Sequence, residues 1–109
     1  MVTAVFSTRD GRPCGFYVAG HSGWAAAGQD IVCSAVSSAV LLAANTQADE
    51  LPAGSARCED GVFALYAPNA PLAAPVLGGL LAHLRAIAKQ YPHHVRVMLL
   101  NRNGGNTNV

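Results

Sequence analysis

A histidine and a cysteine twelve positions apart give this sequence its clearest potential for chemistry. His21 stands in the segment Gly20-His21-Ser22-Gly23, and Cys33 closes the segment Asp30-Ile31-Val32-Cys33. A thiol attacks as the thiolate, and both a helix N-terminus and a nearby imidazole lower its pKa. Cys33 falls where a helical pattern begins, so the two residues are of the types that form a thiol nucleophile and its general base.

Two polar residues stand close to Cys33 in the sequence. Asp30 precedes the helical pattern and has two alternative roles: it caps the helix by accepting a backbone N–H of Val32 or Cys33, or it turns toward His21 and orients the ring. A nearby carboxylate raises the pKa of a thiol, so a protonated His21 is the expected counter-ion. Ser37 lies one helical turn beyond Cys33 on the same face, where its hydroxyl bonds within the site or to a backbone carbonyl.

The alternative to a chemical role for these residues is a structural one. A cysteine on a helix of small residues is commonly a buried small hydrophobe, and a histidine beside glycine is commonly a loop residue. Cys14 on an inward strand face and Cys58 in a short hairpin are explained by packing. The histidine and cysteine spacings match no zinc template, so we expect no metal site and no cofactor.

Length and composition indicate one globular domain. The chain has 109 residues, of which 51% are hydrophobic and 12% are charged. The formal net charge is +1 and the basic residues are scattered, so we expect no nucleic-acid-binding face. Three cysteines without a Cys-x-x-Cys pair form no disulfide framework, which makes a reducing cytoplasm the expected location.

No segment has the character of a secretion signal or a membrane span. The N-terminal residues carry no basic prelude and no small-residue cleavage site. The most apolar stretch, residues 70–84, is shorter than about 18 residues and contains Pro71, Pro75 and His83. We therefore expect a protein without membrane association.

Apolar periodicity and turn residues predict an α+β domain with the element order ββαββαβ and a mixed sheet. Asp-Gly pairs at 10–11 and 60–61 predict two hairpins. The second helix begins after Asn69 and Pro71, or has Pro75 in its first turn, and ends by Tyr91-Pro92. Two helices cannot cover both faces of a five-stranded sheet, so they share one face or another subunit covers the rest. The predicted strands span residues 2–8, 13–19, 55–59, 62–67 and 95–100, the first helix spans 30–44, and residues 101–109 form a flexible tail.

The segments around His21 and Cys33 resemble the signature of a bacterial family, the ribosomal-processing cysteine protease Prp. The family pattern is Gly-His-small-Gly-aromatic, followed by Gly-x-Asp-Ile-Val-Cys-small-Ala-Val-Ser. The resemblance extends over both hairpins, the second helix and the last strand, and covers residues 1–100. The chain departs from the pattern at Trp24, where tyrosine is commoner, and at Ser22 and Ser34, where alanine is usual. The matching residues are Gly20-His21-Ser22-Gly23-Trp24 and Gly28-Gln29-Asp30-Ile31-Val32-Cys33-Ser34-Ala35-Val36-Ser37.

The resemblance implies a homodimeric peptidase. Its substrate is the precursor of large-subunit ribosomal protein twenty-seven, from which it removes a short N-terminal extension by cutting after an aromatic, apolar segment. Carried over by position, Cys33 is the nucleophile, His21 is the general base, and Asp30 and Ser37 are supporting polar residues. Backbone N–H groups at the start of the Cys33 helix are placed to stabilise the oxyanion. The loop that the resemblance implies to be flexible contains Gly20, Ser22, Gly23, Trp24 and Gly28.

Two other function classes stand as alternatives to the protease. A non-enzymatic ribosome-assembly or RNA-binding module needs a basic face, and the scattered basic residues argue against one. A thiol redox sensor using Cys33, with Cys14 as its partner, forms a sulfenic acid or a disulfide under mild peroxide and cleaves no peptide. The sequence favours the protease over both.

Overall fold

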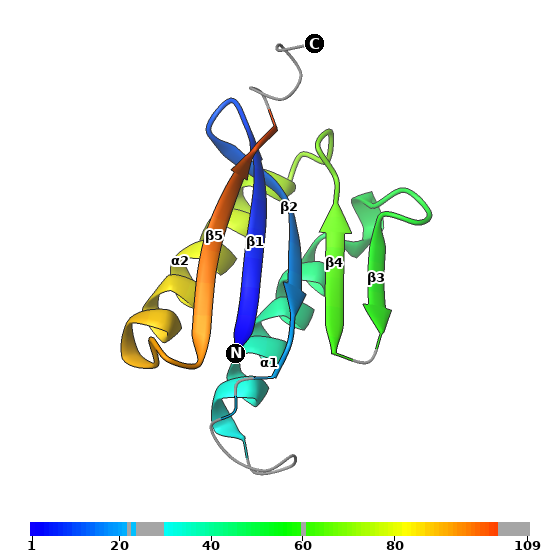
Figure 1. Ribbon diagram of the computed structural model, residues 1–109. Helices are drawn as coiled ribbons and strands as arrows, with labels where there is room; N and C mark the ends of the chain where they lie inside the picture. Colours follow the sequence, from blue (N-terminus) through cyan, green and yellow to red (C-terminus); the bar gives the residue numbers. More distant parts are fainter. Residues whose placement is uncertain (22, 24–29, 60, 103–109) are drawn as a thin grey trace.

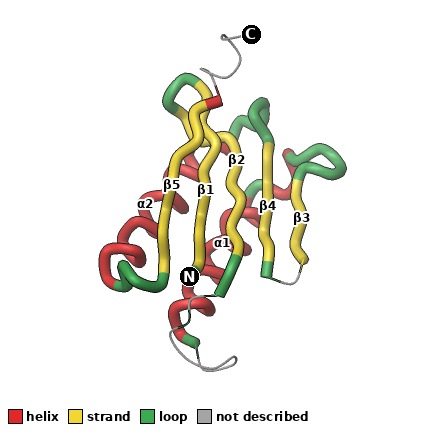
Figure 2. The backbone as a smooth tube through the Cα atoms, viewed as in Figure 1, coloured by secondary structure: helices red, strands yellow, loops and turns green. Residues whose placement is uncertain are grey.

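A computed structural model describes residues 1–21, 23, 30–59 and 61–102. Five strands form one sheet, and two long helices lie together behind one of its faces (Figures 1 and 2). This is the predicted ββαββαβ order, with a short 3-10 turn added after the first helix. The elements are β1 (Val2–Arg9), β2 (Arg12–Ala19), α1 (Ile31–Thr46), η1 (Ala48–Glu50), β3 (Ala56–Glu59), β4 (Val62–Tyr66), α2 (Ala73–Gln90) and β5 (Val95–Asn101).

The sheet has the strand order β3-β4-β2-β1-β5. β1 pairs parallel to β5 with Val2 opposite Val95, and the other three pairs are antiparallel. The sheet is therefore mixed, as predicted. The β1–β2 turn places Asp10 and Gly11 at φ values of 53° and 75°, the left-handed region that an Asp-Gly hairpin turn requires.

The core lies between the sheet and the two helices. Alternate residues of β1 and β2 face it, and the rings of Phe6 and Phe16 pack with centroids 6.2 Å apart. α2 contributes Leu77 and Leu84, both fully buried. Burial of each such side chain stabilises the fold by about 1.5–3 kcal/mol. The core therefore holds α2 firmly against the central strands.

The helices differ from the predictions only at their ends. α1 continues to Thr46, whose hydroxyl donates to the Leu42 carbonyl at 2.7 Å. α2 begins at Ala73, so Pro75 lies in its first turn, which was one of the two predicted starts. The backbone N–H of Leu72, just before α2, donates to Glu50 Oε2 at 2.9 Å. β5 runs one residue beyond its predicted end, to Asn101.

The face of the sheet opposite the helices is open and partly apolar. Strand alternation places Tyr17, Tyr66, Met98 and Leu100 there, with exposed fractions of 47%, 43%, 46% and 46%. The Arg102 guanidinium lies 5.4 Å from the centre of the Tyr66 ring. No second layer of this chain covers these side chains within the described ranges (Figure 2).

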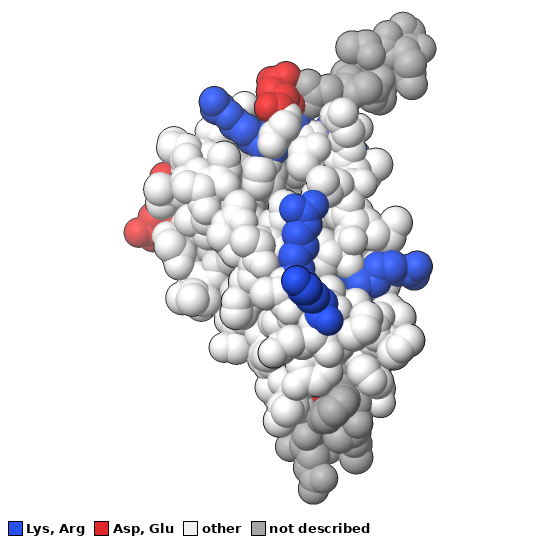
Figure 3. Space-filling view, turned by 90° about the vertical axis from the view of Figure 1, so that its left-hand side faces the viewer, with Lys and Arg blue, Asp and Glu red and all other residues white. Residues whose placement is uncertain are grey.

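Charged side chains are sparse on the surface. On the face shown in Figure 3, the few lysine and arginine side chains lie within a large uncharged area and form no continuous basic surface. In the part of the chain that the structure describes, no helix has the length and apolar character that a membrane span requires.

Candidate active site

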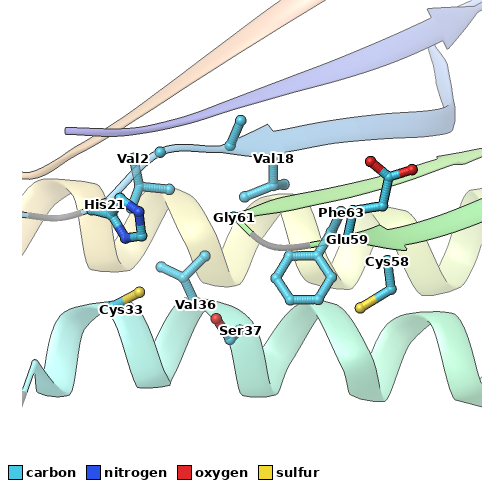
Figure 4. Close-up of a pocket in the computed structure, with 12 residues that line it drawn as sticks. Val2, Val18, His21, Cys33, Val36, Ser37, Cys58, Glu59, Gly61 and Phe63 are labelled. Atoms are coloured by element: carbon cyan, nitrogen blue, oxygen red, sulfur yellow. The ribbon is translucent and has the colours of Figure 1, made fainter. Parts of the chain in front are cut away.

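His21 and Cys33 open into the same cavity, which has a volume of about 480 Å³. The cavity lies between the strand side of the domain and the first turns of α1 (Figure 4). In this view the imidazole of His21 lies across the cavity from the sulfur of Cys33. The lining residues are Val2, Val18, Ala19, Gly20, His21, Cys33, Val36, Ser37, Cys58, Glu59, Gly61 and Phe63.

Cys33 is fixed by the start of α1. Asp30 is the N-cap of the helix, and its Oδ1 accepts the backbone N–H of Cys33 at 2.9 Å. This hydrogen bond satisfies one of the N–H groups that a helix leaves unpaired at its first turn. Of the two roles predicted for Asp30, the structure shows the capping role. Cys33 is half-buried in the first helical turn, where the helix dipole favours negative charge on sulfur.

His21 is fixed by Gly20, the residue that follows β2. Gly20 has a φ of 100°, and a Cβ atom at this position would overlap the backbone carbonyl oxygen of Met1. Its N–H donates to the Gly61 carbonyl at 3.3 Å, which extends the β2–β4 pairing by one hydrogen bond. Only glycine fits between these two backbone segments with this φ. Gly20 therefore aims the next side chain, His21, into the cavity.

Apolar and polar groups share the walls of the cavity. Val18, Val36 and Phe63 form an apolar surface beside the histidine and cysteine. Ser37 extends from α1 into the same space one turn after Cys33, as its spacing predicts (Figure 4). The site therefore combines a thiol, an imidazole and a hydroxyl with a wall that can accept an apolar side chain.

The other two cysteines have different surroundings. Cys14 is buried as predicted, and its Sγ donates to the Ser7 carbonyl at 3.5 Å. Burial raises the pKa of the Cys14 thiol, an effect that the nearby Arg9 and Arg102 partly offset. The packing role predicted for Cys58 is wrong, because Cys58 is exposed and lines the active-site cavity from β3. Cys58 pairs with Phe63 across β3 and β4, and this neighbour follows from the sheet register and not from the sequence alone.

Several predicted site features lie at the edge of the described chain. Gly20 and Gly23 are described, and both have positive φ. Ser22, Trp24 and Gly28 lie outside the described residues. Among the residues that the structure describes, no group of three or more histidine, cysteine or acidic side chains could hold a metal ion. No pattern in the sequence pointed to Val2, Gly61 or Phe63, which reach the cavity from separate strands or turns.

Most of the chain matches one protein family. The model of the family described as cysteine protease Prp matches residues 1–96. No curated protein sequence matches the chain.

Solved structures share the fold. A ribosomal processing protease Prp from S. aureus, in complex with a covalently linked product peptide, is 24% identical. It aligns with a TM-score of 0.78 over 92% of this chain and all of the other. The protein SMU.848 from Streptococcus mutans is 23% identical, with a TM-score of 0.67 over 94% of this chain and 96% of that one. Because the family model spans most of the sequence, the chain belongs to the cysteine protease Prp family and is a cysteine protease.

Proposed function

We propose that Cys33 is the nucleophile of this protease and His21 its general base. The observation that carries the proposal is that thiol and imidazole open into one cavity from elements fixed by backbone hydrogen bonds. The thiolate attacks the scissile carbonyl, and His21 takes the thiol proton and returns it to the leaving amine. The acyl group stays on sulfur until water releases it.

Hydrogen-bond donors for the oxyanion are restricted by the cap. The N–H of Cys33 donates to Asp30 Oδ1, and the N–H of Ser34 donates to the Asp30 carbonyl at 3.1 Å. These two N–H groups already donate to Asp30, although we predicted that N–H groups at the start of this helix would stabilise the oxyanion. The hydroxyl of Ser37 faces the same cavity, and we assign it a supporting hydrogen bond there. Loss of one such donor costs on the order of 10²–10³ in rate in comparable sites.

We propose as substrate the precursor of large-subunit ribosomal protein twenty-seven, cut so that a short N-terminal extension is removed. The S. aureus relative is described as an essential ribosomal processing protease, and it has been solved with a substrate peptide. The apolar wall of Val18, Val36 and Phe63 suits an aromatic, apolar segment before the cut. Because the proposed substrate is a ribosomal protein precursor, we also propose that the enzyme acts in the cytoplasm.

Cleavage of a peptide that copies the precursor junction tests this function. Wild type should release the extension, and both Cys33→Ala and Cys33→Ser should be inactive but folded. Cys14→Ala is the matched control, because its thiol lies outside the cavity. Trimming by purified Cys33→Ala would show that another group is the nucleophile.

We also propose that the enzyme is a homodimer. The open sheet face supports this, because it presents four partly exposed large apolar side chains that no element of the described chain covers. A second copy packed on this face would bury them, and exposed apolar patches of this kind commonly mark interfaces.

A further inference from the structure

Gly61, the residue just before β4, lies beside the imidazole of His21. A Cβ atom built on Gly61 would be 3.9 Å from His21 Nε2, and that is its nearest described neighbour. The two residues are also tied through the backbone, since the Gly61 carbonyl accepts the N–H of Gly20 at 3.3 Å. Figure 4 shows Gly61 between His21 and Phe63 on the strand side of the cavity. The missing side chain therefore leaves free space beside the imidazole.

General acid–base chemistry requires that space. When the acyl-enzyme forms, the C–N bond breaks, its electron pair goes to the leaving nitrogen, and the imidazolium supplies the proton. The leaving nitrogen must then lie about 2.6–3.2 Å from a ring nitrogen of His21. A side chain on residue 61 would start 3.9 Å from Nε2. The atoms of that side chain beyond Cβ would occupy the space that the leaving nitrogen, and the substrate residue that carries it, need beside the imidazole.

We infer that Gly61 is a specificity-determining position: the substrate segment that follows the scissile bond, which leaves as the amine when the acyl-enzyme forms, passes over the Cα of Gly61. This inference rests on the proposed role of His21 as the base. The segment before the cut then occupies the part of the cavity along α1, beside Cys33, Val36 and Ser37. Gly61 therefore sets how large the first residue after the scissile bond can be.

Gly11 offers a matched control for Gly61. Gly11 has a φ of 75° and Gly61 has a φ of 73°, so a substitution meets the same backbone strain at both positions. Both glycines follow an aspartate in the sequence and stand between two antiparallel paired strands. A Cβ on Gly11, however, has no described atom within 4 Å. The two sites therefore differ chiefly in the imidazole beside Gly61.

The test compares Gly61→Ala and Gly61→Asn with Gly11→Ala and Gly11→Asn. Asparagine tolerates positive φ, so these variants are expected to fold. Two peptides copying the precursor junction are used, one with glycine and one with tryptophan as the first residue after the scissile bond. Gly61→Asn should lower kcat/KM for the tryptophan peptide by on the order of 10²-fold, and for the glycine peptide far less. Gly61→Ala should fall between wild type and Gly61→Asn, and the Gly11 variants should match wild type.

Two further measurements separate this inference from a loss of folding and from the proposed function. Iodoacetamide is small, so it should alkylate Cys33 of Gly61→Asn at the wild-type rate, as read by peptide mass mapping. An unchanged preference between the two peptides in Gly61→Asn, with His21→Ala inactive, would overturn the inference alone. Wild-type activity in His21→Ala would overturn both the inference and the proposed base.

Discussion

At the scale of single residues, Asp30 links the stability of α1 to the placement of Cys33, the proposed nucleophile. Its carboxylate accepts the N–H of Cys33 at 2.9 Å, and the residue as a whole is buried, with 8% of its surface exposed. The Asp30 side chain therefore caps the start of α1 and also fixes the backbone of Cys33. Disturbing it should affect the fold and the reaction together.

Two substitutions of Asp30 distinguish the contribution of its capping hydrogen bond to stability from the contribution of its negative charge. Asp30→Ala should lower the free energy of unfolding by about 0.5–2 kcal/mol, because the helix loses its side-chain cap. Asp30→Asn should keep most of that stability, since asparagine caps as well as aspartate. Urea unfolding of the two variants and wild type measures the difference. Equal losses in both variants would mean that the carboxylate charge, and not the cap, supports the helix.

The Cys14 thiol should make the free energy of unfolding depend on pH, and the direction follows from its raised pKa. Burial raises the pKa of its thiol above the ordinary value of 9.0, so the unfolded chain loses this proton at a lower pH than the folded chain. The contribution to stability is complete below that value and is lost as the pH rises through the folded pKa. As the pH rises above the ordinary thiol pKa of 9.0, the free energy of unfolding should therefore fall more steeply in wild type than in Cys14→Ala. Parallel slopes would contradict this.

At the scale of elements, two backbone segments determine where His21 points. The end of β2 is held between the beginning of β1 and the β3–β4 turn by the Gly20 contacts with Met1 and Gly61. The imidazole thus depends on three strands, while the thiol depends on one helix terminus. This division explains why the cavity forms where the strand ends meet the start of α1.

Gly20→Ala should destabilise the protein more than Gly54→Ala. Gly54 has a φ of 83°, and a Cβ atom added there would have no described atom within 4 Å. Alanine at position 54 therefore meets backbone strain alone, on the order of 1–2 kcal/mol. Gly20 adds an overlap with the Met1 carbonyl, so β1 must shift. Urea unfolding compares the two, and an equal loss would show that the Met1 contact is unimportant.

The elements themselves could be predicted from sequence because their signals are local. Asp-Gly turns and strand alternation placed both hairpins, and each predicted strand end lies within one residue of the observed end. The start of α2 could not be chosen, since Pro71 and Pro75 both fit a first turn. The structure settles it with a hydrogen bond from Leu72 to Glu50, 22 residues earlier. A contact over that distance leaves no periodic pattern in the sequence.

At the scale of the whole molecule, the sequence indicated the proposed pair of His21 and Cys33 but not the other residues that line the cavity. His21 and Cys33 stand in a recognisable local pattern. Gly61 and Phe63 reach the cavity only through the pairing of β4 with β2, and Cys58 only through its pairing opposite Phe63. Such neighbours depend on strand register, which single residues do not encode.

The two-layer arrangement makes a prediction about assembly. If the open sheet face joins two copies, Leu100→Asp should convert a dimer to a folded monomer, because a carboxylate would be buried in an apolar interface. Ala86→Asp, on an exposed part of α2, should remain dimeric. Sedimentation equilibrium measures both masses. A Leu100→Asp variant that stays dimeric would place the interface elsewhere.

The most direct test of the proposed chemistry is to find the acyl group on the enzyme. Wild-type protein is mixed with the precursor peptide, quenched in acid, and analysed by intact mass and peptide mapping. We predict an adduct equal to the released N-terminal extension on Cys33, and no adduct on Cys58. Cleavage without any adduct on Cys33, or with the adduct on Cys58, would contradict the assignment of the nucleophile.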